Sequence, residues 1–189
     1  MKKDIIYKTF RKMPVLRTER LILRPMRVTD ADDMYEYASR DDVTRFLLWS
    51  PHDSIFQTKD YLAYIEKRYK AAEFYDWAVT LADTGKMIGT AGFTRLDAQN
   101  SLGEIGYVLN PEYHGMGLGT EAAKRIVDFG FEVLRLHRIE AKFMKGNDAS
   151  LRVMKKLGMT FEGYHADSML VKGLYRTIGY CAIIRPEDK

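Results

Sequence analysis

The segment His114–Gly119 reads His-Gly-Met-Gly-Leu-Gly and joins a strand-like run to a helix-like run. Glycines at alternate positions permit positive φ angles and allow a ligand to approach the backbone closely. The first turn of the following helix leaves backbone N–H groups without intrahelical partners, and the helix dipole favours negative charge beside them. The segment therefore predicts an anion site suited to phosphate oxygens, although these residues alone do not name the ligand.

Two other phosphate-binding loops fit this segment poorly. A dinucleotide-binding loop has the spacing GxGxxG after an early strand, with an acidic residue about 20 residues later. Here the spacing is GxGxG beyond the middle of the chain, and Asp128 and Glu132 fall inside the expected helix. A Walker loop requires Gly-Lys-Ser/Thr, whereas Gly119 is followed by Thr120. A glycine turn that only packs a helix closely against a sheet stays open as an explanation.

Two groups of polar residues flank the loop in the sequence. Glu104 lies in the preceding strand, where Ile105 and Tyr107 alternate to the opposite face. Its carboxylate is a candidate proton acceptor, or a surface carboxylate paired with a lysine. Asn147 stands at the start of a later helix, with Ser150 one turn further on. Both side chains point inward to a reaction centre, or Asn147 only caps the helix and Ser150 is an exposed hydroxyl.

Hydrophobic periodicity predicts the elements that position these residues. Helices are expected to begin near Thr29 and to cover residues 57–72, 117–134 and 149–157, the last closed by Gly158. Strands are expected at residues 21–23, 77–81, 87–94, 102–109, 138–143, 161–164 and 175–184. Helices, then an antiparallel meander, then alternating strands and helices indicate one α+β (mixed α/β) domain. We assign residues 15–186 to this domain and residues 1–14 to a tail, an extension or a leading strand.

Composition indicates an ordinary globular protein. The 189 residues are 46% apolar and 30% charged, with a net charge of +4, so one core is expected. No run reaches the roughly 18 to 20 apolar residues of a membrane span, and the basic N-terminal segment lacks the apolar core of a secretory signal. We therefore expect a cytoplasmic protein with no membrane partner and no direct nucleic-acid partner. The lone Cys181 is expected to be buried, with a reactive thiol as the alternative, and no Cys/His cluster indicates a metal.

Several segments together resemble the GNAT acetyltransferases, and in particular their RimJ/RimL-like branch, which acts on ribosomal-protein N-termini. The family's coenzyme A loop, Arg/Gln-x-x-Gly-x-Gly/Ala, is matched by His114-x-x-Gly117-x-Gly119. Motifs of the branch further along the chain are matched by Asn147-Asp-Ala-Ser150, Leu157-Gly158-Met159 and Glu162-Gly163. Upstream matches are Leu16–Arg24 to the opening strand, Asp30-Ala31 to the first helix and Trp49-Ser-Pro-His52 to the substrate-side loop. The resemblance covers about residues 15–185.

The resemblance implies a fold and a reaction. The fold is a central, twisted, mostly antiparallel sheet of about seven strands, with helices on both faces and two splayed strands that bind coenzyme A. The reaction is transfer of the acetyl group of acetyl-CoA to a primary amine by direct attack, without a metal. The resemblance implies Glu104 and Ser150 as catalytic residues, and Trp49, His52 and Tyr175 as substrate-binding residues. It implies a coenzyme site formed by Val108, Leu109, His114, Gly115, Met116, Gly117, Leu118, Gly119, Thr120, Asn147 and Ser150.

The chain departs from the family pattern at four positions. His114 replaces the usual Arg or Gln, and Met116 stands where a cation is common. Since an imidazole is mostly neutral at pH 7, backbone N–H groups are expected to hold the pyrophosphate. Met154 stands where many members have a tyrosine that protonates the leaving thiolate, so Ser150 is the expected substitute. Thr177 replaces an acidic residue that the branch often carries, which weakens the case for a protein N-terminus as acceptor.

Three functions stay open within this resemblance. The acceptor is a protein N-terminal amine, as in the ribosomal-protein branch, or a small amine such as a polyamine or an antibiotic. Alternatively, the chain is a regulator that binds acetyl-CoA without turnover. A homodimer is one option for its assembly.

Overall fold

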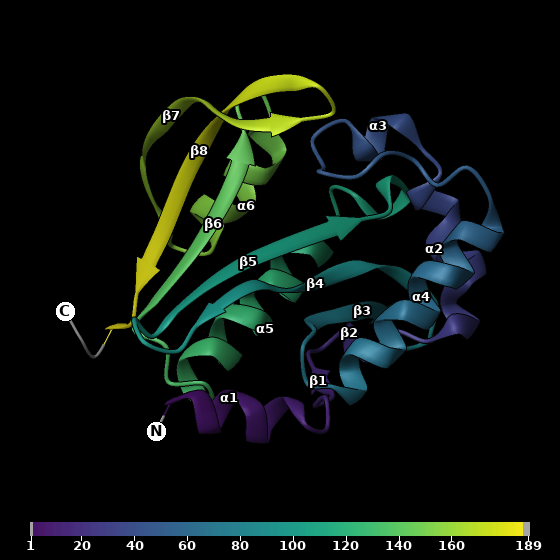
Figure 1. Cartoon of the computed structure of the whole chain (residues 1–189), viewed down its shortest axis with the longest axis horizontal. Helices are drawn as coiled ribbons and strands as arrows, with labels where there is room; N and C mark the ends of the chain where they lie inside the picture. Colours follow the sequence, from purple (N-terminus) through teal and green to yellow (C-terminus); the bar gives the residue numbers. More distant parts are fainter. Residues whose placement is uncertain (1, 187–189) are drawn as a thin grey trace.

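The computed structural model describes residues 2–186 and contains one eight-stranded sheet in the order β1-β2-β3-β4-β5-β6-β8-β7 (Figure 1). Neighbouring strands are antiparallel except β5 and β6, which are parallel. The expected α+β fold is confirmed, with one short strand more than the expected seven. The strands are β1 Leu16–Arg17, β2 Leu21–Arg24, β3 Tyr75–Leu81, β4 Met87–Asp97, β5 Leu102–Leu109, β6 Arg138–Met144, β7 Thr160–Val171 and β8 Leu174–Ile184.

Helices cover both faces of the sheet (Figure 1). Successive side chains of β3 point to opposite faces of the sheet, so both faces carry apolar residues that a helix can cover. Trp77 and Val79 belong to the core shared with α5 and α6, whereas Ala78 belongs to the core shared with α2 and α4. No helix within residues 2–186 is long and apolar enough to cross a membrane. The helices are α1 Lys2–Phe10, α2 Ala31–Ala38, α3 Asp41–Thr44, α4 Ile55–Lys70, α5 Leu118–Glu132 and α6 Asp148–Lys156, with 3-10 turns at Val28–Asp30 and Pro111–Tyr113.

Strands β5 and β6 pair only near their beginnings. Residues 102–105 of β5 pair with residues 138–141 of β6, and beyond this point the two strands diverge (Figure 1). On its other edge β5 stays paired with β4 as far as Leu109. The backbone groups of residues 106–109 that point toward β6 therefore face a gap, and the expected pair of splayed strands is present.

The N-terminal segment forms helix α1 over Lys2–Phe10, so the leading strand that was one expectation for it is not present there. Phe10 at the end of α1 is buried, and its ring centroid lies 4.7 Å from that of Tyr75 and 5.7 Å from that of Trp77. The Trp77 indole N–H also donates a hydrogen bond to the Pro14 carbonyl at 2.7 Å. These contacts make the segment part of the main core. Local sequence pattern missed them because the contacting residues are far apart along the chain.

Strands β7 and β8 form a hairpin that is longer than expected, since β7 covers Thr160–Val171 rather than residues 161–164. Lys172, at the turn, donates from Nζ to the Thr44 carbonyl at the end of α3, at 2.7 Å. Met169, Val171 and Ile178 of the hairpin form a small apolar cluster with Phe46 and Met144. The hairpin therefore bridges the end of β6 to the α3 region, as Figure 1 shows.

Candidate active site

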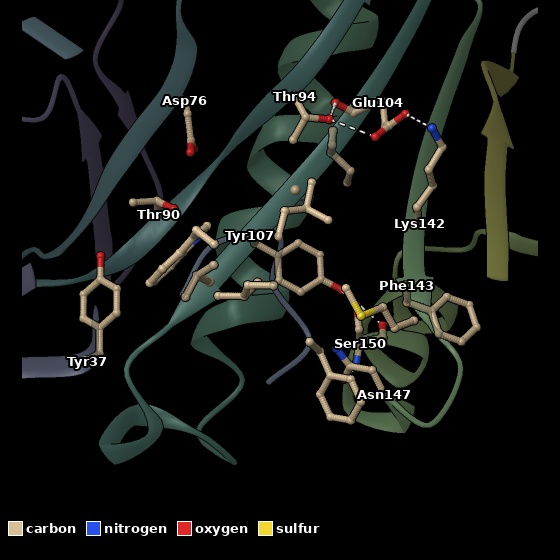
Figure 2. Close-up of a pocket in the computed structure, with 18 of the residues that line it drawn as sticks. Tyr37, Asp76, Thr90, Thr94, Glu104, Tyr107, Lys142, Phe143, Asn147 and Ser150 are labelled. Carbon is tan, nitrogen blue, oxygen red and sulfur yellow. Dashed lines mark hydrogen bonds and ion pairs between the residues drawn. The ribbon is translucent and has the colours of Figure 1, made fainter. Parts of the chain in front are cut away.

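A cavity of about 600 Å³ lies over the α2/α4 face of the sheet and extends to the gap between β5 and β6 (Figure 2). At one end Ser150 and Asn147 approach Tyr107, and at the other end lie Tyr37, Asp76 and Thr90. The cavity brings together six residues named from the sequence, which are Trp49, His52, Glu104, Val108, Asn147 and Ser150.

Two hydroxyl groups meet at the gap end. The Tyr107 hydroxyl on β5 lies 3.0 Å from the Ser150 hydroxyl on α6 and donates to the Ser150 carbonyl at 3.1 Å. Burial raises the pKa of Tyr107 to about 12, although the hydrogen bond to Ser150 lowers it. Tyr107 is therefore protonated at neutral pH. Its hydroxyl has a proton to donate, whereas the buried thioether of Met154 has none.

Asn147 orients this pair by capping α6. Its Oδ1 accepts a hydrogen bond from the Ser150 amide at 3.1 Å, which satisfies a free N–H group of the first helical turn. The capping role that the sequence left open is thus present. The same alternative expected an exposed Ser150 hydroxyl, and this is not observed. Ser150 is half-buried, and its hydroxyl lies within hydrogen-bond distance of the Tyr107 hydroxyl.

Glu104 lines the cavity from β5 with both carboxylate oxygens engaged. Its Oε2 is 2.6 Å from Lys142 Nζ on β6, and its Oε1 accepts a hydrogen bond from the Thr94 hydroxyl at 3.1 Å (Figure 2). Glu104 therefore forms the ion pair with a lysine that the sequence left open as an alternative. The paired carboxylate still lines the cavity. Because a carboxylate has lone pairs for about four hydrogen bonds, Glu104 can still accept a proton through a water molecule.

The glycine loop is open to an anion. Gly115 and Gly117 both have φ of +79°, and Gly117 is the left-handed N-cap of α5. Within the described residues no side chain caps this helix, so the N–H groups of its first turn are left to another partner. A Cβ atom added at Gly115 would meet nothing within 4 Å. The loop therefore fits a phosphate group, and the packing-only explanation accounts for less of its geometry.

His114 is occupied within the loop. Its Nε2 donates to the Leu109 carbonyl at the end of β5, at 3.0 Å. The imidazole therefore connects the loop to the strand beside the gap. This geometry agrees with the expectation that backbone N–H groups, rather than the His114 side chain, hold the anion.

Arg20 fixes the loop from the β1–β2 hairpin, a contact that the sequence did not reveal. Its guanidinium donates to the Met116 carbonyl at 3.0 Å and to Glu121 at 2.7 Å. Burial raises the pKa of Glu121, but hydrogen bonds from Thr18 and Arg20 outweigh burial and leave it lowered. The ionised carboxylate thus ties the first turn of α5 to residues of the opening hairpin.

Asp76 is a half-buried carboxyl group at the far end of the cavity. Burial raises its pKa to about 7, and the hydrogen bond from the Trp77 amide lowers it only in part. The Tyr37 hydroxyl, which lines the same cavity, is buried and has no hydrogen-bond partner among the described residues. This end therefore carries two polar groups that the protein itself does not satisfy fully.

Glycines form the sheet surface between the two ends. Asp76 pairs with Gly92 on β4, and Gly92 pairs with Gly106 on β5, so the three residues form one row across the sheet. Asp76 Oδ1 would lie 2.8 Å from a Cβ atom at Gly92, and a Cβ at Gly106 would lie 2.8 Å from the Thr94 methyl group. Because both positions lack side chains, the Asp76 carboxylate extends over β4 and the space above β5 stays open.

Of the three residues expected to bind substrate, two line the cavity and one does not. Trp49 and His52 line the cavity, with their ring centroids 5.4 Å apart, and burial lowers the pKa of His52. Tyr175 is outside the set of cavity-lining residues, and 69% of its surface is exposed. Its position on β8 close to the tip of the long hairpin explains the difference, since the sequence pattern missed most of β7.

The single cysteine is buried, as expected, and burial raises its thiol pKa. Among residues 2–186, no group of three or more His, Cys, Asp and Glu side chains could hold a metal ion.

Comparison with known proteins identifies the class. Residues 20–160 match the Acetyltransferase (GNAT) domain. The uncharacterized N-acetyltransferase p20 of Bacillus licheniformis is 34% identical over 161 residues, which cover 85% of this chain and 90% of the relative. A GNAT-family acetyltransferase from Bacillus anthracis has a solved structure that matches with a TM-score of 0.81 and 28% identity, over 93% of this chain and 100% of that one. The chain belongs to the GNAT acetyltransferase family and is an acetyl-CoA-dependent N-acetyltransferase.

More distant relatives have names that specify different acceptors. Spermidine N(1)-acetyltransferase of Escherichia coli is 27% identical over 159 residues, 82% of this chain and 80% of the relative. The putative ribosomal N-acetyltransferase YdaF of Bacillus subtilis is 25% identical over 171 residues, 89% of this chain and 93% of the relative. Because the two names differ in acceptor, similarity assigns the acetyl transfer without assigning the amine or the RimJ/RimL-like branch.

Proposed function

We propose that this enzyme acetylates the primary amine of a small molecule bound inside the 600 Å³ cavity. The observation that carries the proposal is that one cavity contains both the Tyr107–Ser150 pair and the half-buried carboxyl group of Asp76. The β7–β8 hairpin bridges to α3 through Lys172 and Thr44, which encloses this side of the gap. An enclosed site with a half-buried carboxylate suits a small cationic acceptor better than an extended polypeptide.

Acetyl-CoA supplies the activated acetyl group, and two features of this chain suit it. The N–H groups of residues 115–120 would hold the pyrophosphate at the start of α5. The free edge of β5 at Val108 and Leu109 would pair with the pantetheine arm in the gap and direct a backbone N–H at the thioester carbonyl. This arrangement brings the sulfur next to Ser150.

Two groups would handle the protons of the reaction. An amine attacks only when it is neutral, and Glu104, oriented by Thr94 and Lys142, would take its proton through a water molecule. The Tyr107–Ser150 pair would give a proton to the departing thiolate. One proton is thus removed from the amine and one is added to the sulfur, so the two groups return to their starting states by exchange with solvent.

Release of coenzyme A thiol from acetyl-CoA tests the proposal. Small primary amines should give kcat/KM values at least about tenfold above those of peptides with N-terminal Ala or Ser, a difference of about 1.4 kcal/mol. A preference for the peptides would overturn the small-molecule acceptor and favour the ribosomal-protein branch. Coenzyme binding without thiol release for any amine would point to the regulator.

A further inference from the structure

We infer that the acceptor carries a second amino group, which binds between Asp76, Tyr37 and Thr90 while the first is acetylated beside Ser150. The inference rests on the proposed function and names its substrate class, a diamine or a longer polyamine. Three observations support it, and each concerns a different property of the far end of the cavity.

The first observation is an unpaired carboxylate. Asp76 accepts a hydrogen bond from the Trp77 amide at 3.0 Å, and the groups that shift its pKa include no cation. Asp76 is half-buried, and a carboxylate that has lost much of its contact with water is costly unless a cation pairs with it. A cation that enters the cavity would therefore be attracted to Asp76.

The second observation is the unused hydroxyl of Tyr37. It is buried, lines the cavity and lacks a hydrogen-bond partner among the described residues. Figure 2 shows Tyr37, Thr90 and Asp76 at one end of the cavity, with the Tyr37 hydroxyl turned toward the other two side chains. A buried polar group without a partner costs free energy, which a ligand can recover. An ammonium group has three N–H donors, which match one carboxylate and two hydroxyl oxygens.

The third observation is the distance to the reaction end. Asp76, Gly92 and Gly106 lie in one row on adjacent strands, so Asp76 and Gly106 are about 10 Å apart at the backbone, two strand spacings. The gap between β5 and β6, which Ser150 borders, begins at Gly106. An acceptor that spans the cavity should therefore have two nitrogen atoms separated by on the order of 10 Å, joined by a slender chain that lies over the glycines.

The experiment compares α,ω-diamines of increasing length with monoamines of the same carbon count, by thiol release from acetyl-CoA. The ratio of kcat/KM for a diamine to that of its matched monoamine should reach about 10 to 100, as expected for a charged hydrogen bond. The ratio should be highest where the nitrogen atoms are about 10 Å apart. Asp76→Asn should bring the ratio close to one, and Tyr37→Phe should lower it by a smaller factor. Asp60→Asn, the same change on the exposed surface of α4, should leave the ratio unaltered.

A second measurement separates this inference from the proposed function. The best diamine is titrated calorimetrically into the complex of the enzyme with coenzyme A, for the wild type, Asp76→Asn and Tyr37→Phe. Binding that depends on Asp76 but gives no thiol release with acetyl-CoA would overturn the proposed function and support the second-amine site. Equal rates for diamines and monoamines, unchanged in Asp76→Asn, would overturn the site and leave the proposed function standing. Tyr37→Phe removes a buried hydroxyl that has no hydrogen-bond partner among the described residues, so this variant should fold. Its diamine-to-monoamine ratio therefore still tests the second-amine site if Asp76→Asn is unstable.

Discussion

The Tyr107 hydroxyl on β5 and the Ser150 hydroxyl on α6 lie 3.0 Å apart, on opposite sides of the gap between β5 and β6. The residue that occupies the family's tyrosine position is Met154, which is buried and has no proton to give. In the proposed reaction the two hydroxyls together would supply the proton that the resemblance assigns to a tyrosine at the Met154 position.

Tyr107→Phe and Ser150→Ala should each lower kcat by about 100-fold, the size of a typical general-acid contribution. If the hydroxyls act as one unit, the double variant should be little worse than the more damaged single variant. Single-turnover thiol release measures the step directly. A double variant reduced by the product of the two single effects would show that the residues act independently.

Glu104→Gln should lower kcat/KM by about 100-fold, since an amide cannot accept the amine proton. Lys142→Met is the matched control, because it breaks the same 2.6 Å ion pair but keeps the carboxylate. It should retain most of the activity. Comparable losses in both variants, or full turnover of Glu104→Gln at both low and high pH, would show that the pair only supports the sheet.

Gly117→Val should weaken coenzyme A binding much more than His114→Ala. Valine at a φ of +79° is strained by about 1 to 3 kcal/mol, and the loop would shift its N–H groups to relieve that strain, at a cost of roughly 5- to 150-fold in Kd. His114→Ala removes only the hydrogen bond to the Leu109 carbonyl, so a change of a few-fold is expected. Calorimetric titration with coenzyme A decides between them, and equal losses would contradict a backbone anion site.

Asp76 should make the protein less stable as pH rises. Its pKa is about 7 in the folded state and 3.8 as the ordinary value, so between these pH values the folded chain keeps a proton that the unfolded chain has lost. Stability then falls by about 1.4 kcal/mol per pH unit, or about 4 kcal/mol in total. The neighbouring phenols of Tyr37, Tyr61 and Tyr69 have pKa values raised by burial and do not titrate in this range.

The measurement is urea unfolding of the wild type and Asp76→Asn at several pH values from 4 to 8. The free energy of unfolding of the variant should rise relative to that of the wild type between pH 4 and 7, and stay level above that. A constant difference across the range would show that the carboxyl group titrates normally. Because only the difference is compared, other titrating groups cancel.

The coenzyme side of the site was predictable because it is built from backbone. The loop that begins at His114 and the helix after it depend on glycine spacing and on a free helix N-terminus, both of which are local in the sequence. The strand over residues 102–109 was equally visible from its pattern, and the structure has the same bounds. Asn147 could be recognised as a cap for the same reason.

The proposed acceptor side was not predictable because it depends on strand register. Asp76 precedes an apolar run by one residue and has no motif around it. Only the pairing of Asp76 with Gly92, and of Gly92 with Gly106, shows that a carboxylate faces the open part of the sheet. The Tyr107–Ser150 contact likewise requires two strands to diverge, and the contact of Arg20 with Glu121 joins the first hairpin to a helix in the second half of the chain.

The packing of α1 matters to anyone who prepares this enzyme. A shortened chain that starts at Val15 would uncover the rings of Trp77 and Phe129, which Phe10 covers at centroid distances of 5.7 and 6.1 Å. Such a product should aggregate on expression, although every residue of the reaction site is still encoded.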